Sequence, residues 1–130
     1  MKSAFLIIAL VLLVVTQSSY FPSHGNHVDG SYNGILGSNN FVGGNFNKLF
    51  GHNNAVLGHK NNVFGNSNGI FGSFNNAKGS YNGIVGHGNN VYGNANGIFG
   101  NGNTALGSGN GIAGHGNFVH GFGNRIGFHY

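Results

Sequence analysis

The chain has 130 residues, of which 27 are glycine and 5% are charged, and its formal net charge is +4. This composition excludes an ordinary globular domain, and the absence of cysteine excludes a domain held by disulfides. Because Asp29 is the only acidic residue, catalysis by paired carboxylates is also excluded, and we expect no enzyme, no catalytic residue and no cofactor.

The first predicted element is a secretory signal peptide at residues 1–19. Lys2 precedes an uninterrupted apolar stretch at residues 4–15, and the "TQSS" that follows offers small residues for cleavage. The stretch is too short to span a bilayer comfortably, and a short membrane anchor is the alternative interpretation. We expect the mature protein to be secreted and extracellular, without a membrane span.

Residues 20–25 follow as a predicted N-terminal lead or cap, with Pro22 among them. A cap is expected here because an open strand edge would pair with other chains. The rest of the chain, residues 26–130, is a single repeat region.

The repeat region has a period of seven residues. Asparagine occupies every seventh position from Asn26 to Asn124, fifteen times without a gap. Two residues after each asparagine comes Val, Ile, Leu or Ala, and two residues later comes glycine, except in the last unit, where Phe128 replaces it. Repeats of this size stack into solenoids. We expect the asparagines to form a hydrogen-bonded structural ladder, with these central members: Asn54, Asn61, Asn68, Asn75, Asn82, Asn89, Asn96 and Asn103.

The spacing within each unit predicts a strand and excludes a helix. A coiled coil needs two apolar positions per heptad, and here only one is reliably apolar. Glycine in every second helical turn would cost about 1 kcal/mol each time. Residues two apart instead follow the period of a strand with one face turned inward. A disordered Gly/Asn-rich filler and an up-and-down meander through Asn-Gly turns are the alternatives.

Two units make one coil. Between Asn61 and Gly111, the residue directly after each asparagine alternates between a polar residue and glycine. The glycines are Gly69, Gly83, Gly97 and Gly111, and the polar residues are Asn62, Asn76, Asn90 and Thr104. This alternation has a period of fourteen residues. The predicted fold is therefore all-β: a β-solenoid, or β-roll, of about seven 14-residue coils with two parallel sheets that face each other.

The units "NNVFG", "NAVLG" and "NGIVG" resemble the xxNxVxG repeat of the grass ice-recrystallisation-inhibition (antifreeze) proteins, and the match covers residues 26–127. The family fold is a β-roll with about two repeats per coil, so the resemblance implies the same fold and ice as a binding partner. A weaker similarity links the repeat to the β-roll heads of trimeric bacterial adhesins. The grass proteins carry many Thr, Ser and Val residues outward, whereas Thr104 is the only threonine of the repeat region.

Large apolar residues occupy many of the predicted outward positions. A soluble monomer seldom exposes contiguous apolar patches, so these rows predict contact with a partner. The expected partner is the protein itself, as an oligomer or fibre, or an extended extracellular surface. The candidate surface-binding residues are Phe50, Leu57, Phe64, Phe71, Val85, Tyr92, Phe99 and Leu106.

The histidines predict no metal site. His59, His87 and His115 are 28 residues apart, which places them on one corner of every second coil, ~9.6 Å from one to the next. This separation is too large to share a metal ion at bond lengths of about 2 Å. We interpret them as polar corner residues, with weak surface metal binding or charging in acid as the alternative. The scattered basic residues form no stripe, which argues against nucleic-acid binding: Lys48, Lys60, Lys78 and Arg125.

The function that these patterns favour is that of a secreted, non-enzymatic repeat protein acting as a structural, self-assembling or surface-binding β-roll. Inhibition of ice recrystallisation is the alternative that the family resemblance implies. A cationic Gly/His-rich antimicrobial protein is a third reading of the composition.

Overall fold

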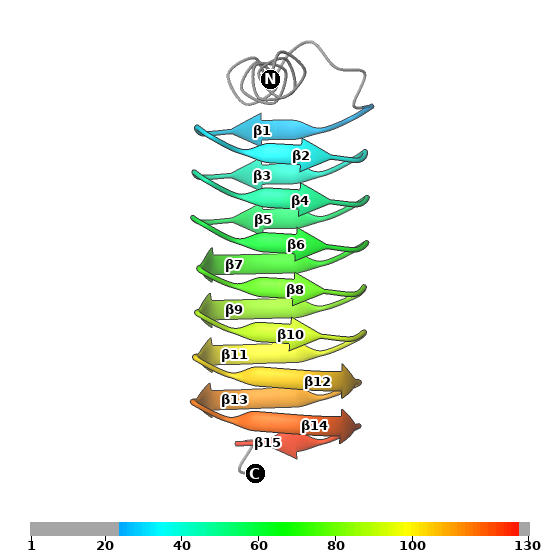
Figure 1. Ribbon diagram of the computed structural model, residues 1–130, viewed down its shortest axis with the longest axis vertical. Coiled ribbons are helices and arrows are strands. Elements are labelled where there is room, and N and C mark those ends of the chain that lie inside the picture. Colours follow the sequence, from blue (N-terminus) through cyan, green and yellow to red (C-terminus); the bar gives the residue numbers. More distant parts are fainter. Residues whose placement is uncertain (1–23, 128–130) are drawn as a thin grey trace, which may run out of the picture.

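The computed structural model describes residues 24–127, which fold into 15 short β-strands (Figure 1). These residues contain no helix, and hence none long and apolar enough to cross a membrane. The predicted signal peptide, all of the predicted lead before His24, and residues 128–130 lie outside the described part of the chain.

The strands alternate between two sheets, which we call sheet A and sheet B. Sheet A contains the eight odd-numbered strands: β1 (His27–Asp29), β3 (Phe41–Gly43), β5 (Ala55–Leu57), β7 (Gly69–Ser73), β9 (Gly83–His87), β11 (Gly97–Asn101), β13 (Gly111–His115) and β15 (Arg125–Ile126). Sheet B contains the seven even-numbered strands: β2 (Gly34–Leu36), β4 (Lys48–Phe50), β6 (Asn62–Phe64), β8 (Asn76–Lys78), β10 (Asn90–Tyr92), β12 (Thr104–Ser108) and β14 (Phe118–Phe122).

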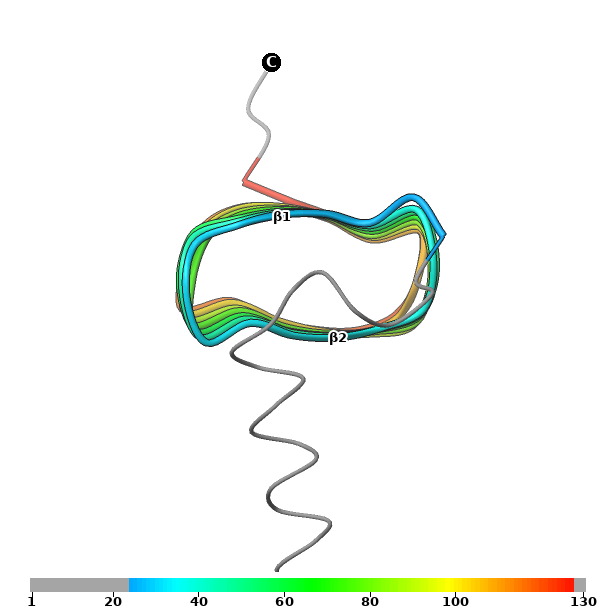
Figure 2. The same cartoon turned by 90° about the horizontal axis from the view of Figure 1, so that it is seen from above.

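Every coil repeats the one before it. All strand pairs of the described chain are parallel and join residues fourteen apart, as Val28 with Val42 and Ile70 with Ile84. Seen along the axis, the coils superimpose on one flattened ring (Figure 2). The predicted all-β solenoid of about seven 14-residue coils with two parallel sheets is therefore confirmed. The disordered filler is wrong, and so is the meander, because its Asn-Gly turns would make antiparallel pairs.

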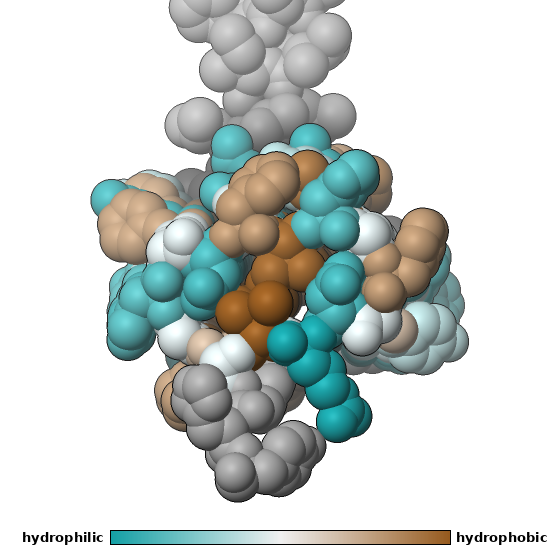
Figure 3. Space-filling view, turned by 90° about the horizontal axis from the view of Figure 1, so that it is seen from below, coloured by the Kyte–Doolittle hydropathy of each residue, from teal (hydrophilic) through white to brown (hydrophobic). Residues whose placement is uncertain are grey.

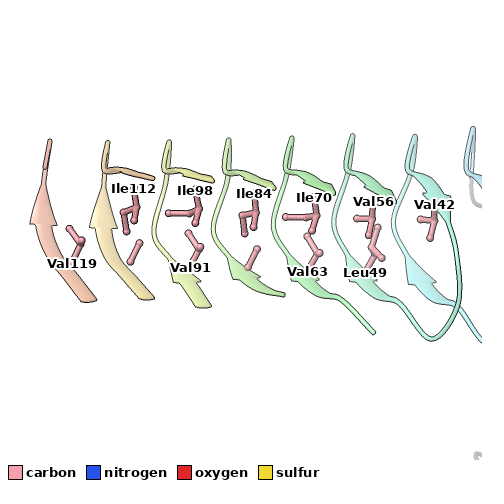
Figure 4. Packing of buried hydrophobic residues seen from close by; sticks show 12 residues of the cluster. Val42, Leu49, Val56, Val63, Ile70, Ile84, Val91, Ile98, Ile112 and Val119 are labelled. Carbon is pink, nitrogen blue, oxygen red and sulfur yellow. The ribbon is translucent and has the colours of Figure 1, made fainter. Parts of the chain in front are cut away.

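The aliphatic residue of each unit forms the core. From Val42 to Val119, these twelve side chains are no more than 5% exposed. Figure 4 shows them pointing toward one another from the two sheets, and Figure 3 shows apolar residues at the centre of the molecule when it is viewed from below. Each burial contributes roughly 1.5 to 3 kcal/mol for the larger side chains. One inward apolar residue per strand thus makes a narrow core between the sheets.

The predicted asparagine ladder lies at the edge of this core, and its central members are at most 2% exposed. Asn68 is representative. Its Nδ2 donates to Asn54 Oδ1 at 3.1 Å and to the Gly79 carbonyl oxygen at 2.8 Å. Its Oδ1 accepts from the backbone N–H of Asn82 at 3.0 Å and from Asn82 Nδ2 at 3.1 Å. Asparagine is required because this position needs two donors and a carbonyl acceptor on a short stem.

The glycine that ends each strand, the corner glycine, allows the coils to stack closely. Its φ lies between 115° and 138° from Gly30 to Gly121, a region that other residues rarely adopt. At Gly72, a methyl group would also overlap the carbonyl oxygen of Gly86 in the next coil. This glycine therefore provides both a positive φ and a close backbone approach at the corner.

Candidate interaction surfaces

Two side chains of each strand face solvent. The first outward position directly follows the ladder asparagine, and the second outward position directly follows the core residue. Parallel pairing in register aligns each position into a row along the solenoid, as Phe50 with Phe64 and Phe99 with Val85. The candidate surface-binding residues all occupy the second outward position, and the structure brings them into two rows, one on each sheet.

The second outward row of sheet B is mainly aromatic and aliphatic. The rings of Phe50 and Phe64 stack with centroids 4.8 Å apart and planes 5° apart, and Lys78 Nζ lies 5.3 Å from the centroid of the Tyr92 ring. Tyr92 is only half-exposed, and its hydroxyl accepts from Asn76 Nδ2 at 3.0 Å. The full row is Leu36, Phe50, Phe64, Lys78, Tyr92, Leu106 and His120.

The first outward row of sheet B is mostly polar, with Lys48, Asn62, Asn76, Asn90 and Thr104 in consecutive coils. Asn62 Oδ1 and Asn76 Oδ1 are the buried side-chain oxygens without a hydrogen-bond partner in the described part of the chain. The inward ladder differs, because its amide groups are hydrogen-bonded at both ends, as at Asn68.

Sheet A presents an apolar ridge beside a trough. The ridge is part of the second outward row: Leu57, Phe71, Val85 and Phe99 are 40%, 60%, 42% and 65% exposed. The trough lies alongside in the first outward row: Gly69, Gly83 and Gly97 would have nothing within 4 Å of an added Cβ. None of these three has a positive φ. The fold therefore does not itself require glycine in the trough.

A third apolar feature, which the sequence analysis missed, lies on the corner that follows sheet A. Tyr32, Phe46, Lys60 and Phe74 occupy successive coils there, each directly before a ladder asparagine, with φ of 56° to 59°. Tyr32 stacks on Phe46 at 4.8 Å, and Lys60 Nζ lies 5.1 Å from the Phe74 centroid. We call this set the corner aromatic row. The left-handed conformation costs a non-glycine residue about 1–2 kcal/mol. The corner aromatic row therefore lowers the stability of the fold relative to glycine at the same positions.

A second ladder, also missed, runs along both corners. From Asn45 to His115, the residue directly after each corner glycine accepts a hydrogen bond from the backbone N–H of its counterpart one coil earlier. His52 Nδ1, Asn66 Oδ1 and Ser80 Oγ accept in this way at 2.9 to 3.2 Å. From Ser31 to His115 this position is always Ser, Asn or His, and that restriction was the available sequence signal.

The predicted corner histidines belong to this second ladder. The Nδ1 atoms of His59, His87 and His115 accept backbone N–H groups at 3.1, 3.2 and 3.3 Å. Among the described residues no group of three or more His, Cys, Asp or Glu side chains could hold a metal ion. The histidines thus have a hydrogen-bonding role that the sequence analysis did not assign.

Comparison with models of known protein families finds none that matches the chain, and comparison with curated proteins finds no match either. The structure supports a β-roll repeat fold, and neither comparison supports the resemblance to the grass or adhesin repeats.

Proposed function

We propose that the protein is a secreted, non-enzymatic structural β-solenoid that associates with itself, or with an extended extracellular surface, through its outward apolar rows. The observation that carries this proposal is the exposure of two long rows of large apolar side chains on opposite faces of one narrow rod. Phe64 is 36% exposed on sheet B, and Phe99 is 65% exposed on sheet A.

The energetics support a binding role for these rows. Burying one such side chain contributes roughly 1.5 to 3 kcal/mol, and each row repeats the contribution at every coil. A contiguous patch of this kind on a soluble protein marks an interaction site. Secretion is proposed from the apolar stretch at residues 4–15, and the absence of enzymatic activity from the single carboxylate, Asp29.

The test uses protein recovered from the medium of a secreting host, in light scattering and in binding to alkyl-coated beads. Phe64→Ser and Phe99→Ser together should lower both association and bead binding by at least tenfold, because each loses about 1.5 to 3 kcal/mol of apolar burial. Tyr81→Ser is the matched control: Tyr81 is 71% exposed but lies on a corner outside both rows. Unchanged behaviour of the double variant would refute the proposal.

Ice binding is the second candidate, and the polar row of sheet B is the observation that favours it. Asn62, Asn76, Asn90 and Thr104 repeat at the coil spacing on a regular parallel sheet. An ice-recrystallisation assay tests this candidate. Inhibition that Asn90→Leu abolishes would favour it over self-association, whereas ice crystals that coarsen as in buffer alone would exclude it.

A further inference from the structure

The two sheets differ in how their outward positions are filled. In sheet A, five successive strands from β3 to β11 each combine one large outward residue with one small one. Their pairs, first outward position before second, are Phe41 with Gly43, Ala55 with Leu57, Gly69 with Phe71, Gly83 with Val85, and Gly97 with Phe99. In sheet B the same positions are both occupied by larger side chains from β4 to β12, as Asn62 with Phe64 and Asn90 with Tyr92.

Three of the small residues of sheet A have no conformational or packing role within one chain, whereas a Cβ added at Gly43 would lie 2.7 Å from Leu57 Cδ2. Gly69, Gly83 and Gly97 have no positive φ and no neighbour within 4 Å of an added Cβ. Glycine inside a strand costs about 0.5–1 kcal/mol, and it marks places where another backbone or ligand approaches closely. At Phe41 and Gly43 the order of large and small is reversed, yet one small residue is still kept. These strands thus share one rule: each strand, or level along the solenoid axis, has one large and one small outward residue.

We propose that sheet A is the interface of a symmetric dimer, in which a second copy of this chain packs face to face with its solenoid axis parallel to the first. This inference deepens the proposed self-association by naming its face, its partner and its symmetry. The two-fold axis would run parallel to the solenoid axis, outside sheet A and directly opposite its row of inward core residues.

This symmetry brings opposite positions together. A two-fold axis along the solenoid keeps every strand level with its own copy but reverses left and right. The first outward position of each strand then faces the second outward position of the same strand in the other copy. Phe99 of one copy enters the trough at Gly97 of the other, and the reverse contact forms at the same level, as isologous interfaces require. An antiparallel pair, with its axis along the strands, would set ridge against ridge and trough against trough.

Charge and periodicity also fit a second copy. At the level of β1, the same symmetry sets Asp29 of one copy opposite His27 of the other, an acid opposite a base. No charged residue lies in the outward rows of sheet A between this level and Arg125 of β15. A second copy also has the same spacing between strands along the solenoid axis. The ridge of one copy therefore stays opposite the trough of the other over the full length of the sheet, as in a steric zipper.

The available area is sufficient for a concentration-dependent dimer. Eight strands spaced ~4.8 Å apart and about five residues wide give a face of about 38 by 17 Å, or roughly 1,300 Å² buried over both copies. That lies at the lower part of the range for stable protein interfaces.

The test measures the dimer dissociation constant by sedimentation velocity, on protein from a secreting host. Gly97→Phe fills the trough and should weaken the dimer at least about tenfold. Asn90→Phe introduces the same side chain at the equivalent position of sheet B and should leave the constant unchanged. The exchange Gly97→Phe with Phe99→Gly should restore it, because each level would again combine large with small. Far-UV circular dichroism and the thermal midpoint establish that every variant keeps the fold.

The outcomes separate this inference from the proposed function. A wild-type protein that stays monomeric and binds no alkyl surface would overturn both. A wild-type protein that associates, but whose association Gly97→Phe and Asn90→Phe weaken equally, would overturn the sheet A interface and leave the proposed function standing. Loss of the dimer in Gly97→Phe without recovery in the exchanged variant would overturn the parallel two-fold arrangement.

Discussion

At the scale of single residues, the inward asparagine is the most constrained position of the repeat. Asn68 is 2% exposed, and its side chain and backbone N–H take part in five hydrogen bonds, three of them through Nδ2 and the backbone N–H and two through Oδ1. The two Nδ2 donors and the Oδ1 acceptor serve different neighbours. A carboxylate of the same shape lacks the donors, so shape alone cannot fill the position.

We therefore expect Asn68→Asp to destabilise the protein strongly. The variant loses both Nδ2 bonds and places an oxygen near the Gly79 carbonyl oxygen, to which Nδ2 donates at 2.8 Å. Leaving a buried acceptor without its donor costs about 1–3 kcal/mol per group, and a buried charge costs more. Urea unfolding at pH 7 should show a loss above about 3 kcal/mol.

Asn90→Asp provides the matched control, because Asn90 faces solvent on sheet B. Its unfolding free energy should change by less than about 0.5 kcal/mol, as for other surface substitutions. Equal losses in the two variants would show that the inward amides are not the main polar support of the fold.

Residue-level sequence reasoning succeeded where one chemical type recurs without exception. Every ladder asparagine and core aliphatic residue was assigned its inward direction from spacing alone. The left-handed residues before the asparagines were missed because they are chemically mixed. Phe74 and Lys60 stand where Gly88 and Gly102 stand further along, and propensity does not predict a positive φ for a phenylalanine.

At the scale of the strand and its corner, the second ladder adds hydrogen bonds between neighbouring coils. His52, His59, His87 and His115 each accept a backbone N–H through Nδ1. Alanine has no acceptor at this position, so it would leave each backbone N–H without its protein partner.

Replacing these four histidines by alanine should therefore lower the thermal midpoint, because four backbone N–H groups lose their side-chain acceptors. At about 0.5 kcal/mol for each of these exposed bonds, the four together contribute about 2 kcal/mol. Calorimetry measures the loss.

The control for this prediction comes from the chain itself. Asn45 and Asn66 fill the same corner position and accept the same bond. Replacing the four histidines by asparagine should therefore keep the stability of the wild type. A loss as large as in the alanine variant would show that the corner acceptors do not support the fold.

The strands were predictable because each one is marked by three residues that recur every seven positions: the ladder asparagine, the core aliphatic residue and the corner glycine. The corner chemistry was not predicted, although its Ser/Asn/His restriction was present in the sequence. The acceptor role becomes visible only when residues fourteen apart are known to be neighbours, as Ser73 and His87 are. The outward rows were predicted as a pattern, but their pairing into ridge and trough needed the observed register.

At the scale of the whole molecule, the backbone repeats every seven residues, whereas its two surfaces repeat every fourteen. Any whole number of units can therefore be removed without breaking the ladder, the core or the corners, since repeat proteins draw their stability from neighbouring units. Only an even number keeps each unit on its own sheet. Folding thus depends on the seven-residue period of the sequence, and the proposed dimer on the fourteen-residue period.

Two deletions separate these periods. Removing residues 75–88 takes out β8 and β9 and leaves every later strand on its original sheet, so the solenoid should fold and still form the proposed dimer over a shorter face. Removing residues 75–81 takes out β8 alone and moves each later strand to the opposite sheet. Sheet A would then contain Asn90 with Tyr92 and Thr104 with Leu106, levels without a small residue.

Both variants should show the β-sheet circular dichroism of the parent, and their thermal midpoints should be close to each other. Sedimentation velocity should find that the 75–88 deletion associates much as the wild type does, whereas the 75–81 deletion dissociates at least about tenfold more readily. The longer deletion removes more apolar surface, so simple loss of hydrophobic area predicts the reverse order. Weaker association of the longer deletion would therefore contradict an interface that depends on the alternation of large and small residues along sheet A.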